Sequence, residues 1–323
     1  ALAAVNSPFV TRLMYAYESP SQLFLVLDLL PGGTLAFHLH QERRFRPKVA
    51  KYFASCIMLG LQAVHSCGLV YRDLKPDNIL MDSHGYIKLS DMGLVCKVTP
   101  SLHGVCGTRG YWAPEVLQKY DENRKRVCYD QTSDWFSFGC VVYEMVAGKN
   151  PFYCSEAIEF GISDGSTTKK DAVNKAILEW DPIYEPKYFD DASSDLCSKL
   201  LSKDPKKRLG AIGCEEIMSH PWFSRTEWPK LIINSLEPPY RPPRDVNALS
   251  QNDIGTFDSC KVQSQQEDVL SAFLNDEGDN DFEWTWTNPE AFQKEVIGFL
   301  QHERKVGGVL RPQADCECCC SIS

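Results

Sequence analysis

The sequence predicts an α+β fold in which a short β-rich N-terminal segment precedes a larger, mainly helical region. Phe9 to Tyr17 and Gln22 to Leu30 have the composition of strands, and the turn-forming Glu18-Ser19-Pro20-Ser21 lies between them. From Pro47 to His65, apolar residues recur at the spacing of an amphipathic helix. Helical patterns dominate after this point, so the predicted sheet is small and the helical region large.

The other elements follow in order. Residues 1–5 look like the last turn of a helix that begins upstream, so we expect the sequence to be a partial chain. Pro31-Gly32-Gly33 ends the strand region. Further along the chain, the sequence predicts a strand at 86–89 and helices at 134–147, 194–201 and 215–218.

Proline marks the end of the compact region. Four prolines lie between Pro238 and Pro243, and proline neither continues a helix nor donates to a strand ladder. We expect an extended tail after them, followed by an amphipathic helix from Ala291 to His302 and a flexible end from Gly307 to Ser323.

Composition excludes several classes of protein. The 323 residues carry a formal net charge of −9, which argues against nucleic-acid binding, because phosphate contacts need clustered Lys and Arg. The hydrophobic content of 43% is that of a globular protein, and no apolar run approaches the roughly 18 residues of a membrane span. Fourteen cysteines without a signal peptide indicate reduced thiols in a cytosolic protein.

The strongest chemical signal is the run Tyr71-Arg72-Asp73-Leu74-Lys75-Pro76-Asp77-Asn78. It resembles the catalytic loop of protein kinases, with Tyr where His usually stands. The resemblance implies that Asp73 orients the substrate hydroxyl and accepts its proton, that Lys75 neutralises charge on the phosphoryl group, and that Asn78 holds Mg²⁺. A plain polar turn is the alternative, and eight matching positions in a row weigh against it.

A second motif, Ser90-Asp91-Met92-Gly93, follows the strand predicted at 86–89. It resembles the D-F-G element of kinases, whose Asp binds the Mg²⁺ that bridges the phosphates of ATP. Asp91 is therefore the second expected metal ligand, beside Asn78. Met92 replaces the usual Phe and fills the same kind of apolar slot.

Residues 107–115 resemble the end of a kinase activation segment. The resemblance implies that Thr108 hydrogen-bonds Asp73 and Lys75, as in kinases specific for Ser and Thr. It also implies an ion pair between Glu115 and a buried Arg208, which would be costly to break from one side.

Residues 134–139 resemble the helix that braces the catalytic loop, which makes four motifs in the family's order. The resemblance implies a protein-kinase fold from about Leu2 to Phe223, mainly the α-helical C-lobe with a remnant of the N-lobe sheet. The residues expected to have structural roles are Arg72, Glu115, Asp134 and Arg208.

The segment from Leu23 to Gly33 resembles the last small-lobe strand and the hinge of a kinase. The resemblance implies that backbone groups of Asp28 and Leu30 bond the adenine of ATP, with Leu27 as gatekeeper and Leu80 beneath the ring. A buried hydrophobic strand would use the same residues, and only position favours the hinge.

Two parts of a working kinase are missing from the sequence. No G-x-G-x-x-G precedes the hinge, and the only lysines before Asp73 are Lys48 and Lys51, both on the long predicted helix. Without the Gly-rich loop and the strand lysine, the β- and γ-phosphates lose most of their cradle. We therefore expect a polypeptide of these residues alone to transfer phosphate negligibly.

Within the kinases, the chain resembles the AGC group and its G-protein-coupled receptor kinases. Met92, the Tyr-Arg-Asp form of the loop, and the tail from Pro238 to Asp258 carry this resemblance. Gly104 stands where many AGC kinases have a phosphorylated Thr, so activation would come from the receptor. Thr34 stands where kinases that select basic substrates have a carboxylate. Asp77 in the catalytic loop is acidic and could also bind a basic substrate, but we expect no strong preference for basic substrates.

The resemblance also divides the chain. The expected divisions are an N-lobe remnant and hinge (1–30), a C-lobe (31–225), an AGC-type C-terminal tail (226–262), the terminal helices of a regulator-of-G-protein-signalling-homology domain (263–303) and a flexible lipidation tail (304–323).

The last four residues, 320–323, fit C-a-a-X with a terminal Ser, which implies farnesylation of Cys320. One prenyl chain holds a membrane only marginally, and Cys316, Cys318 and Cys319 could add palmitoyl chains. We expect a cytoplasmic protein held peripherally at the membrane; a disordered Cys-rich end or a small metal site is the alternative. Prenylation is typical of the opsin kinases, whereas the tail resembles the β-adrenergic-receptor-kinase branch, so both branches stay open.

Two functions follow from these residues. The leading one is a serine/threonine protein kinase that uses ATP and Mg²⁺ to phosphorylate activated G-protein-coupled receptors. The alternative is a non-catalytic, membrane-tethered module that binds partners through its large-lobe surface. The polar residues of the first two motifs argue against the alternative, because a scaffold has no chemical need for all of them.

Overall fold

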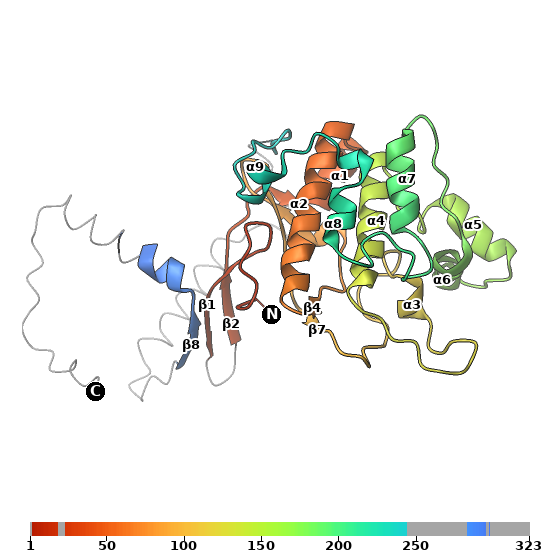
Figure 1. Cartoon of the computed structure of the whole chain (residues 1–323), viewed down its shortest axis with the longest axis horizontal. Helices are drawn as coiled ribbons and strands as arrows, with labels where there is room; N and C mark the ends of the chain where they lie inside the picture. Colours follow the sequence, from red (N-terminus) through yellow and green to blue (C-terminus); the bar gives the residue numbers. More distant parts are fainter. Residues whose placement is uncertain (1, 19–22, 244–282, 295–296, 298–323) are drawn as a thin grey trace, which may run out of the picture. The chain divides into compact units, whose positions relative to one another are not determined.

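The structure, a computed structural model, describes residues 2–18, 23–243, 283–294 and 297 (Figure 1). The chain divides into two compact units: a larger one of Ala1–Arg12 and Asp28–Asn275, and a smaller one of Leu13–Leu27 and Asp276–Ser323. Helices dominate the described part of the larger unit, and a sheet forms the smaller one. The predicted α+β class is therefore confirmed.

The described helices of the larger unit are α1 (Leu35–Glu42), α2 (Pro47–Ser66), α3 (Pro114–Leu117), α4 (Thr132–Ala147), α5 (Ser155–Ser163), α6 (Lys169–Glu179), α7 (Asp191–Leu200), α8 (Cys214–Met218) and α9 (Trp228–Ile232). Among the described residues, no helix combines the length and the hydrophobicity that crossing a bilayer requires. Two short sheets accompany the helices: β3 (Gly33–Thr34) with β5 (Ile79–Met81) and β6 (Ile87–Leu89), and β4 (Leu69–Val70) with β7 (Cys96–Lys97).

The core of the larger unit forms around α2 and α4, which lie side by side with α7 (Figure 1). The apolar positions that predicted α2 are buried, and Pro47 stands in its first turn, where no intrahelical N–H bond is lost. α4 is buried on nearly every side, as expected of a helix that is hydrophobic all round. The prediction of α2 was accurate to one residue at its C-terminus.

Two helices begin earlier than their apolar patterns indicated. α7 starts at Asp191 because Asp190 and Ser193 form a reciprocal capping box, with Asp190 Oδ1 accepting from the Ser193 N–H at 2.7 Å. α4 starts at Thr132, whose N–H donates to Asp130 Oδ1 at 2.8 Å. In both cases polar side chains, rather than hydrophobic periodicity, set the first turn.

The predicted N-terminal helix end and the predicted start of the first strand are both wrong. Residues 2–4 form a turn, since so short a segment gains too few hydrogen bonds to offset helix nucleation. β1 (Leu13–Glu18) begins four residues later than predicted. Phe9 and Thr11 instead exchange backbone hydrogen bonds of 2.8 Å with Leu89 of β6, which ties this stretch to the larger unit.

The smaller unit is an antiparallel sheet in the order β2–β1–β8, formed by β1, β2 (Leu23–Leu27) and β8 (Glu283–Thr287). β8 was not predicted, although it falls within the range 263–303 assigned to terminal helices. Residues 289–294 are helical, in partial agreement with the helix predicted at 291–302, while the stretch 266–273 lies outside the described residues. Strand pairing across about 270 residues leaves no local signal.

The proline-rich segment does not leave the large unit at Pro238. Pro238 is buried, and the Tyr240 hydroxyl lies 3.0 Å from Nδ1 of the buried His38, whose Nε2 lies 2.6 Å from the Gly32 carbonyl oxygen. Burial lowers the pKa of His38, which favours the neutral ring that can accept from Tyr240 and donate to Gly32. The segment is therefore connected to the glycine turn that precedes α1.

Changing Gly85 to Ala is expected to displace this segment. A Cβ at Gly85 would lie 1.9 Å from the carbonyl oxygen of Tyr240, and the residue has φ +97°. We expect a loss of about 1–3 kcal/mol in the free energy of unfolding, with faster proteolytic cleavage between residues 225 and 243. Gly165→Ala is the matched control, because its φ of +93° imposes similar strain in open space. Equal losses in the two variants would show that the contact with Tyr240 contributes nothing.

Candidate active site

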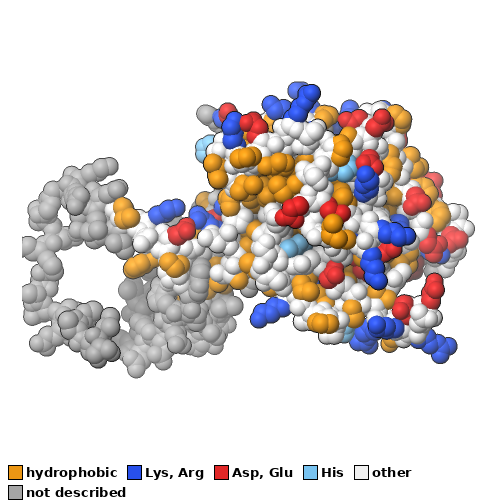
Figure 2. Space-filling view, viewed as in Figure 1, with side chains coloured by type: hydrophobic (Ala, Val, Ile, Leu, Met, Phe, Trp, Pro, Cys, Tyr) orange, Lys and Arg blue, Asp and Glu red, His pale blue; other side chains and the backbone are white. Residues whose placement is uncertain are grey.

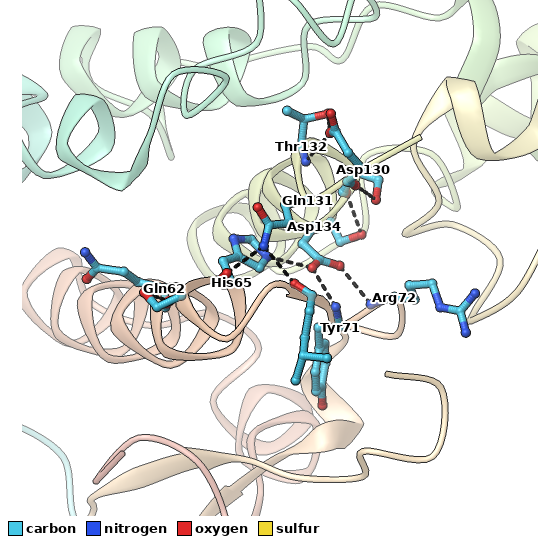
Figure 3. A network of polar contacts seen from close by, with 12 residues as sticks. Gln62, His65, Tyr71, Arg72, Asp130, Gln131, Thr132 and Asp134 are labelled. Atoms are coloured by element: carbon cyan, nitrogen blue, oxygen red, sulfur yellow. Dashed lines mark hydrogen bonds and ion pairs between the residues drawn. The ribbon is translucent and has the colours of Figure 1, made fainter. Parts of the chain in front are cut away.

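The loop after β4 is held by one buried carboxylate, that of Asp134 in the first turn of α4 (Figure 3). Its two oxygens accept the backbone N–H groups of Tyr71 and Arg72, each at 2.8 Å, and Oδ2 lies 2.7 Å from Nε2 of His65. Gln131 donates to the carbonyls of His65 and Leu69. Arg72 has φ +70°, a conformation that needs such support.

Four polar side chains meet just beyond this support. The Thr108 hydroxyl donates to Asp73 Oδ1 at 2.7 Å, Lys75 Nζ lies 3.2 Å from Asp73 Oδ2, and Asn78 Nδ2 donates to that same oxygen at 2.9 Å. Lys75 also donates to the Thr108 hydroxyl at 2.7 Å. The structure thus brings together the three residues predicted to be catalytic and fixes the orientation of the Asp73 carboxylate.

Asn78 and Asp91 supply oxygen atoms of the kind that Mg²⁺ prefers. Nδ2 of Asn78 donates to both the main chain and the side chain of Asp73, so its amide oxygen is oriented by those bonds. The Asp91 side chain is exposed, and its backbone has φ +55°. Its Oδ1 accepts the Gly93 N–H at 3.1 Å. The Ser90 N–H donates to the Asn78 carbonyl at 2.8 Å, which joins the two segments. This donor set fits a magnesium ion.

The residues predicted to contact adenine are Asp28, Leu30 and Leu80, and all three belong to the larger unit. Asp28 directly follows the last residue of β2. The Asp28 N–H donates to the Arg12 carbonyl at 3.1 Å, so its own carbonyl is the group that remains for a ligand. Although burial alone would raise the pKa of the Asp28 carboxyl, the hydrogen bond from Lys88 and the charges of Lys88 and Arg12 lower it overall. Leu30 and Leu80 are both half-buried, Leu80 on β5.

The expected pair that ties the activation segment to the helical core has close geometry. Arg208 donates to Oε1 of Glu115 at 2.6 Å and to Oε2 at 2.9 Å, in the bidentate arrangement that suits a guanidinium. Arg208 also donates to the carbonyls of Thr132 and Ser202. Both charged side chains are buried.

A tyrosine lies beside Gly104, the position where many AGC kinases have a phosphorylated Thr. The Tyr129 hydroxyl donates to the Gly104 carbonyl at 3.0 Å and lies 3.5 Å from Nη1 of Arg72 and 3.7 Å from the sulfur of Cys106. A single side chain therefore connects the catalytic loop with the activation segment. No sequence pattern singled out Tyr129, because its contacts span 23 to 57 residues.

A second residue that the sequence did not reveal is Glu144, on α4. Burial raises the pKa of its carboxyl to about 7; the hydrogen bond from the Tyr111 hydroxyl, 2.6 Å long, lowers it, and the charge of Asp77 raises it. Glu144 stands inside a predicted helix, but its burial could not be predicted from helical periodicity. Its carboxyl and that of Asp77 form an acidic region near the activation segment.

Glu144→Gln is expected to stabilise the chain at pH 8 and not at pH 4.5. Because the folded pKa of about 7 lies above the ordinary value of 4.5, proton binding stabilises the fold fully below pH 4.5, and this contribution is lost as the pH rises through 7. The pKa shift corresponds to about 3 kcal/mol of unfolding free energy at most. The measurement is the unfolding free energy of the variant minus that of the parent, taken at each of the two pH values. Glu159→Gln, at an exposed position of α5, is the control. The same difference at both pH values would contradict a buried neutral carboxyl.

Of the predicted site residues, Cys320 and the neighbouring Cys316, Cys318 and Cys319 lie outside the described part of the chain. Leu27, the predicted gatekeeper, belongs to the smaller unit, and the remaining site residues belong to the larger one. Asp73, Lys75, Thr108 and Asn78 are in direct contact. Asp28, Leu30 and Leu80 belong to the strand and hinge region, and Asp91 follows β6. Their roles in binding and catalysis stay predictions.

Comparison with known proteins identifies a family and several relatives. The model of the family described as "Protein kinase domain" matches residues 1–223. The chain is 39% identical over 272 residues to G protein-coupled receptor kinase 2 of Drosophila melanogaster, which is 80% of this chain and 36% of that protein. It is 37% identical over 257 residues to beta-adrenergic receptor kinase 1 of Rattus norvegicus, with 78% and 35% covered.

A third relative is cAMP-dependent protein kinase type 3 of Saccharomyces cerevisiae, 36% identical over 259 residues, with 80% of this chain and 59% of that protein covered. The chain spans about a third of the length of the two receptor kinases and less than two thirds of the yeast kinase.

Proposed function

Since this chain belongs to the protein kinase family, we propose that the natural protein containing it is a serine/threonine kinase that phosphorylates activated G-protein-coupled receptors with ATP. The observation that carries the proposal is the arrangement of Thr108, Lys75 and Asn78 around the Asp73 carboxylate. Phosphoryl transfer depends mainly on positioning and on charge stabilisation, and this cluster supplies both.

In the proposed reaction the substrate hydroxyl oxygen attacks the γ-phosphorus of ATP, the bond from that phosphorus to the β-γ bridging oxygen breaks, and ADP leaves. Asp73 orients the hydroxyl and accepts its proton, which solvent later removes. Thr108 and Asn78 keep the carboxylate oriented through bonds of 2.7 and 2.9 Å. Lys75, 3.2 Å from Asp73 Oδ2, is close enough to stabilise negative charge on the transferred group.

The nucleotide would be held by the hinge and by a divalent ion. The Asp28 carbonyl and a backbone group of Leu30 would bond the adenine edge, with Leu80 against the ring. Asn78 and Asp91 would hold Mg²⁺, which neutralises charge on the phosphates when it is bound. The donor set and the joined backbone of the two segments support this assignment.

Receptor substrates are proposed because two relatives are named as receptor kinases and because this chain shares features with that family. Met92 in the D-F-G position and Gly104 in the activation segment are two of these features. Tyr129, which contacts Arg72 and Gly104, would hold the activation segment without a phosphate. The opsin-kinase and β-adrenergic-receptor-kinase branches both stay open.

The proposed protein is cytoplasmic and joins the membrane through farnesyl on Cys320. Cys316, Cys318 and Cys319 would carry a second lipid, since one prenyl chain binds only marginally. These cysteines lie outside the described residues. Mass spectrometry of the C-terminal peptide tests this: an unmodified Cys320 with Ser323 still attached would contradict it.

The function is tested with the longest natural polypeptide that contains these 323 residues. Its purified form is given ATP, Mg²⁺ and a purified receptor, with and without agonist, and phosphoserine and phosphothreonine are counted. We expect phosphorylation that requires Mg²⁺ and increases with agonist. A preference for free peptides with arginine three residues before the acceptor, and indifference to agonist, would contradict the receptor-kinase proposal.

A further inference from the structure

The first turns of α2 and the segment that precedes them carry a concentration of positive charge in an acidic protein. Between residues 42 and 51 there are five cations against one acid, Glu42, while the whole chain has a net charge of −9. The cations are Arg43, Arg44, Arg46, Lys48 and Lys51. Within the described part of the chain, none of the five has a carboxylate within 4 Å.

The start of α2 adds to this charge instead of compensating it. The helix is 20 residues long, its N-cap Arg46 offers no side-chain cap, and its first turn holds no acidic residue. The positive end of a helix dipole usually attracts carboxylates, and here it faces lysine and arginine side chains. An external anion would satisfy both the helix end and the side chains.

A pocket of about 220 Å³ lies beside these cations, between α2 and the segment around α9. Lys48, Lys51 and Arg225 line it, together with Thr226. Two acids also line it, and each has its own cation: Glu237 lies 2.7 Å from Arg241, and Glu227 pairs with Lys230. Three cations with no carboxylate within 4 Å suit a phosphate group, although Lys51 also lies 5.7 Å from the centre of the Trp222 ring.

Exposed apolar side chains border the same pocket. α9 ends in Ile232, which is 48% exposed and is followed by Ile233, which is 73% exposed, while Leu231 and Leu236 line the pocket beside them. Figure 2 shows hydrophobic side chains gathered over the region of α9, with Lys and Arg side chains along the upper border of that face. A soluble anion would need only the cations. Cations beside exposed isoleucines match the two parts of a membrane interface, anionic headgroups and acyl chains.

We propose that this basic–apolar face binds a membrane surface rich in anionic phospholipids, with a lipid phosphate seated in the pocket between α2 and α9. The three cations of the pocket attract the charged headgroups, and Ile232 and Ile233 insert at the level where headgroups meet acyl chains. This inference goes beyond phosphoryl transfer and does not require prenylation, because every contact that it uses lies between residues 43 and 239. It gives the kinase a membrane contact on its folded surface.

The test uses the unlipidated 323-residue chain, whose binding to vesicles needs no kinase activity. Sedimentation is measured with vesicles of phosphatidylcholine alone, of phosphatidylcholine with phosphatidylserine, and of that mixture with a phosphoinositide. At about 1 kcal/mol for each cation near an anionic surface, Lys48→Gln/Lys51→Gln/Arg225→Gln is expected to weaken binding to anionic vesicles roughly 100-fold. Ile232→Ser/Ile233→Ser is expected to weaken it as well, with less dependence on salt.

A matched control removes the same charge elsewhere: Lys119→Gln/Arg124→Gln/Lys125→Gln, at exposed positions after α3. Unchanged thermal unfolding of each variant shows that a difference in binding does not come from altered folding. If the control triple weakened binding to anionic vesicles equally, net charge alone would explain the binding and the proposal would be overturned. Equal binding to neutral vesicles would also overturn it. So would saturable binding of millimolar inorganic phosphate without any vesicle binding, which would identify a soluble phosphate as the ligand.

Discussion

Replacing Arg208 with methionine is expected to lower the free energy of unfolding by about 3–5 kcal/mol, the largest stability effect we predict for a single substitution. The methionine fills much of the same volume but leaves the Glu115 carboxylate buried without its cation. It also removes donors to the carbonyls of Thr132 and Ser202. Urea denaturation of the 323-residue chain measures the loss.

The double variant Arg208→Met/Glu115→Gln separates the ion pair from simple packing. It removes both charges, so we expect it to recover part of the loss. Lys199→Met is the matched control, because Lys199 and Asp195 form a pair of 2.7 Å with both side chains about half exposed, which is worth less than about 1 kcal/mol. A loss below 1 kcal/mol for Arg208→Met would mean that Glu115 finds another partner or is protonated.

Asp73→Asn is expected to reduce kcat by about 10²- to 10⁴-fold, the contribution usual for a positioned general base. The amide keeps the shape of the side chain but cannot take the substrate proton. KM for ATP should change little, because Asp73 is not among the residues assigned to the nucleotide. The assay uses the longest natural polypeptide that contains this chain, since residues 1–323 include no Gly-rich loop.

Asp191→Asn, an exposed substitution in the first turn of α7, is the control for the chemistry of the change. Its kcat should equal that of the parent. If Asp73→Asn kept kcat within tenfold, Asp73 would not be the base, and the contacts with Thr108 and Lys75 would be structural.

The sequence was most informative where a pattern is local or where a motif is long. The five apolar positions of α2 gave its length, because a buried helix must repeat its apolar face every 3.6 residues. The eight residues from Tyr71 to Asn78 predicted the chemistry, and the family match agrees with that resemblance. The kinase resemblance implied a pair between Glu115 and Arg208, which the structure brings within 2.6 Å.

Several failures share one physical cause, which is dependence on contacts made far along the chain. Phe9 to Thr11 have strand composition, yet their backbone groups bond to Leu89 instead of extending β1. β8 exists as a strand only beside β1, and its own sequence carries no signal for that partner. α1 and α6 were missed although Thr34 and Thr168 cap them, because capping is a weaker signal than periodicity.

By itself, then, the sequence determined the family, the order of its motifs and the residues that could take part in phosphoryl transfer, because these depend on residue type and spacing. Tertiary structure alone decided the contacts that belong to no family motif. The raised pKa of the half-buried Glu144 carboxyl, the hydroxyl of Tyr129 between Arg72 and Gly104, and the contact of Tyr240 with His38 each arise where distant segments pack. Burial and hydrogen bonding across such distances are properties of the fold, so no local pattern encodes them.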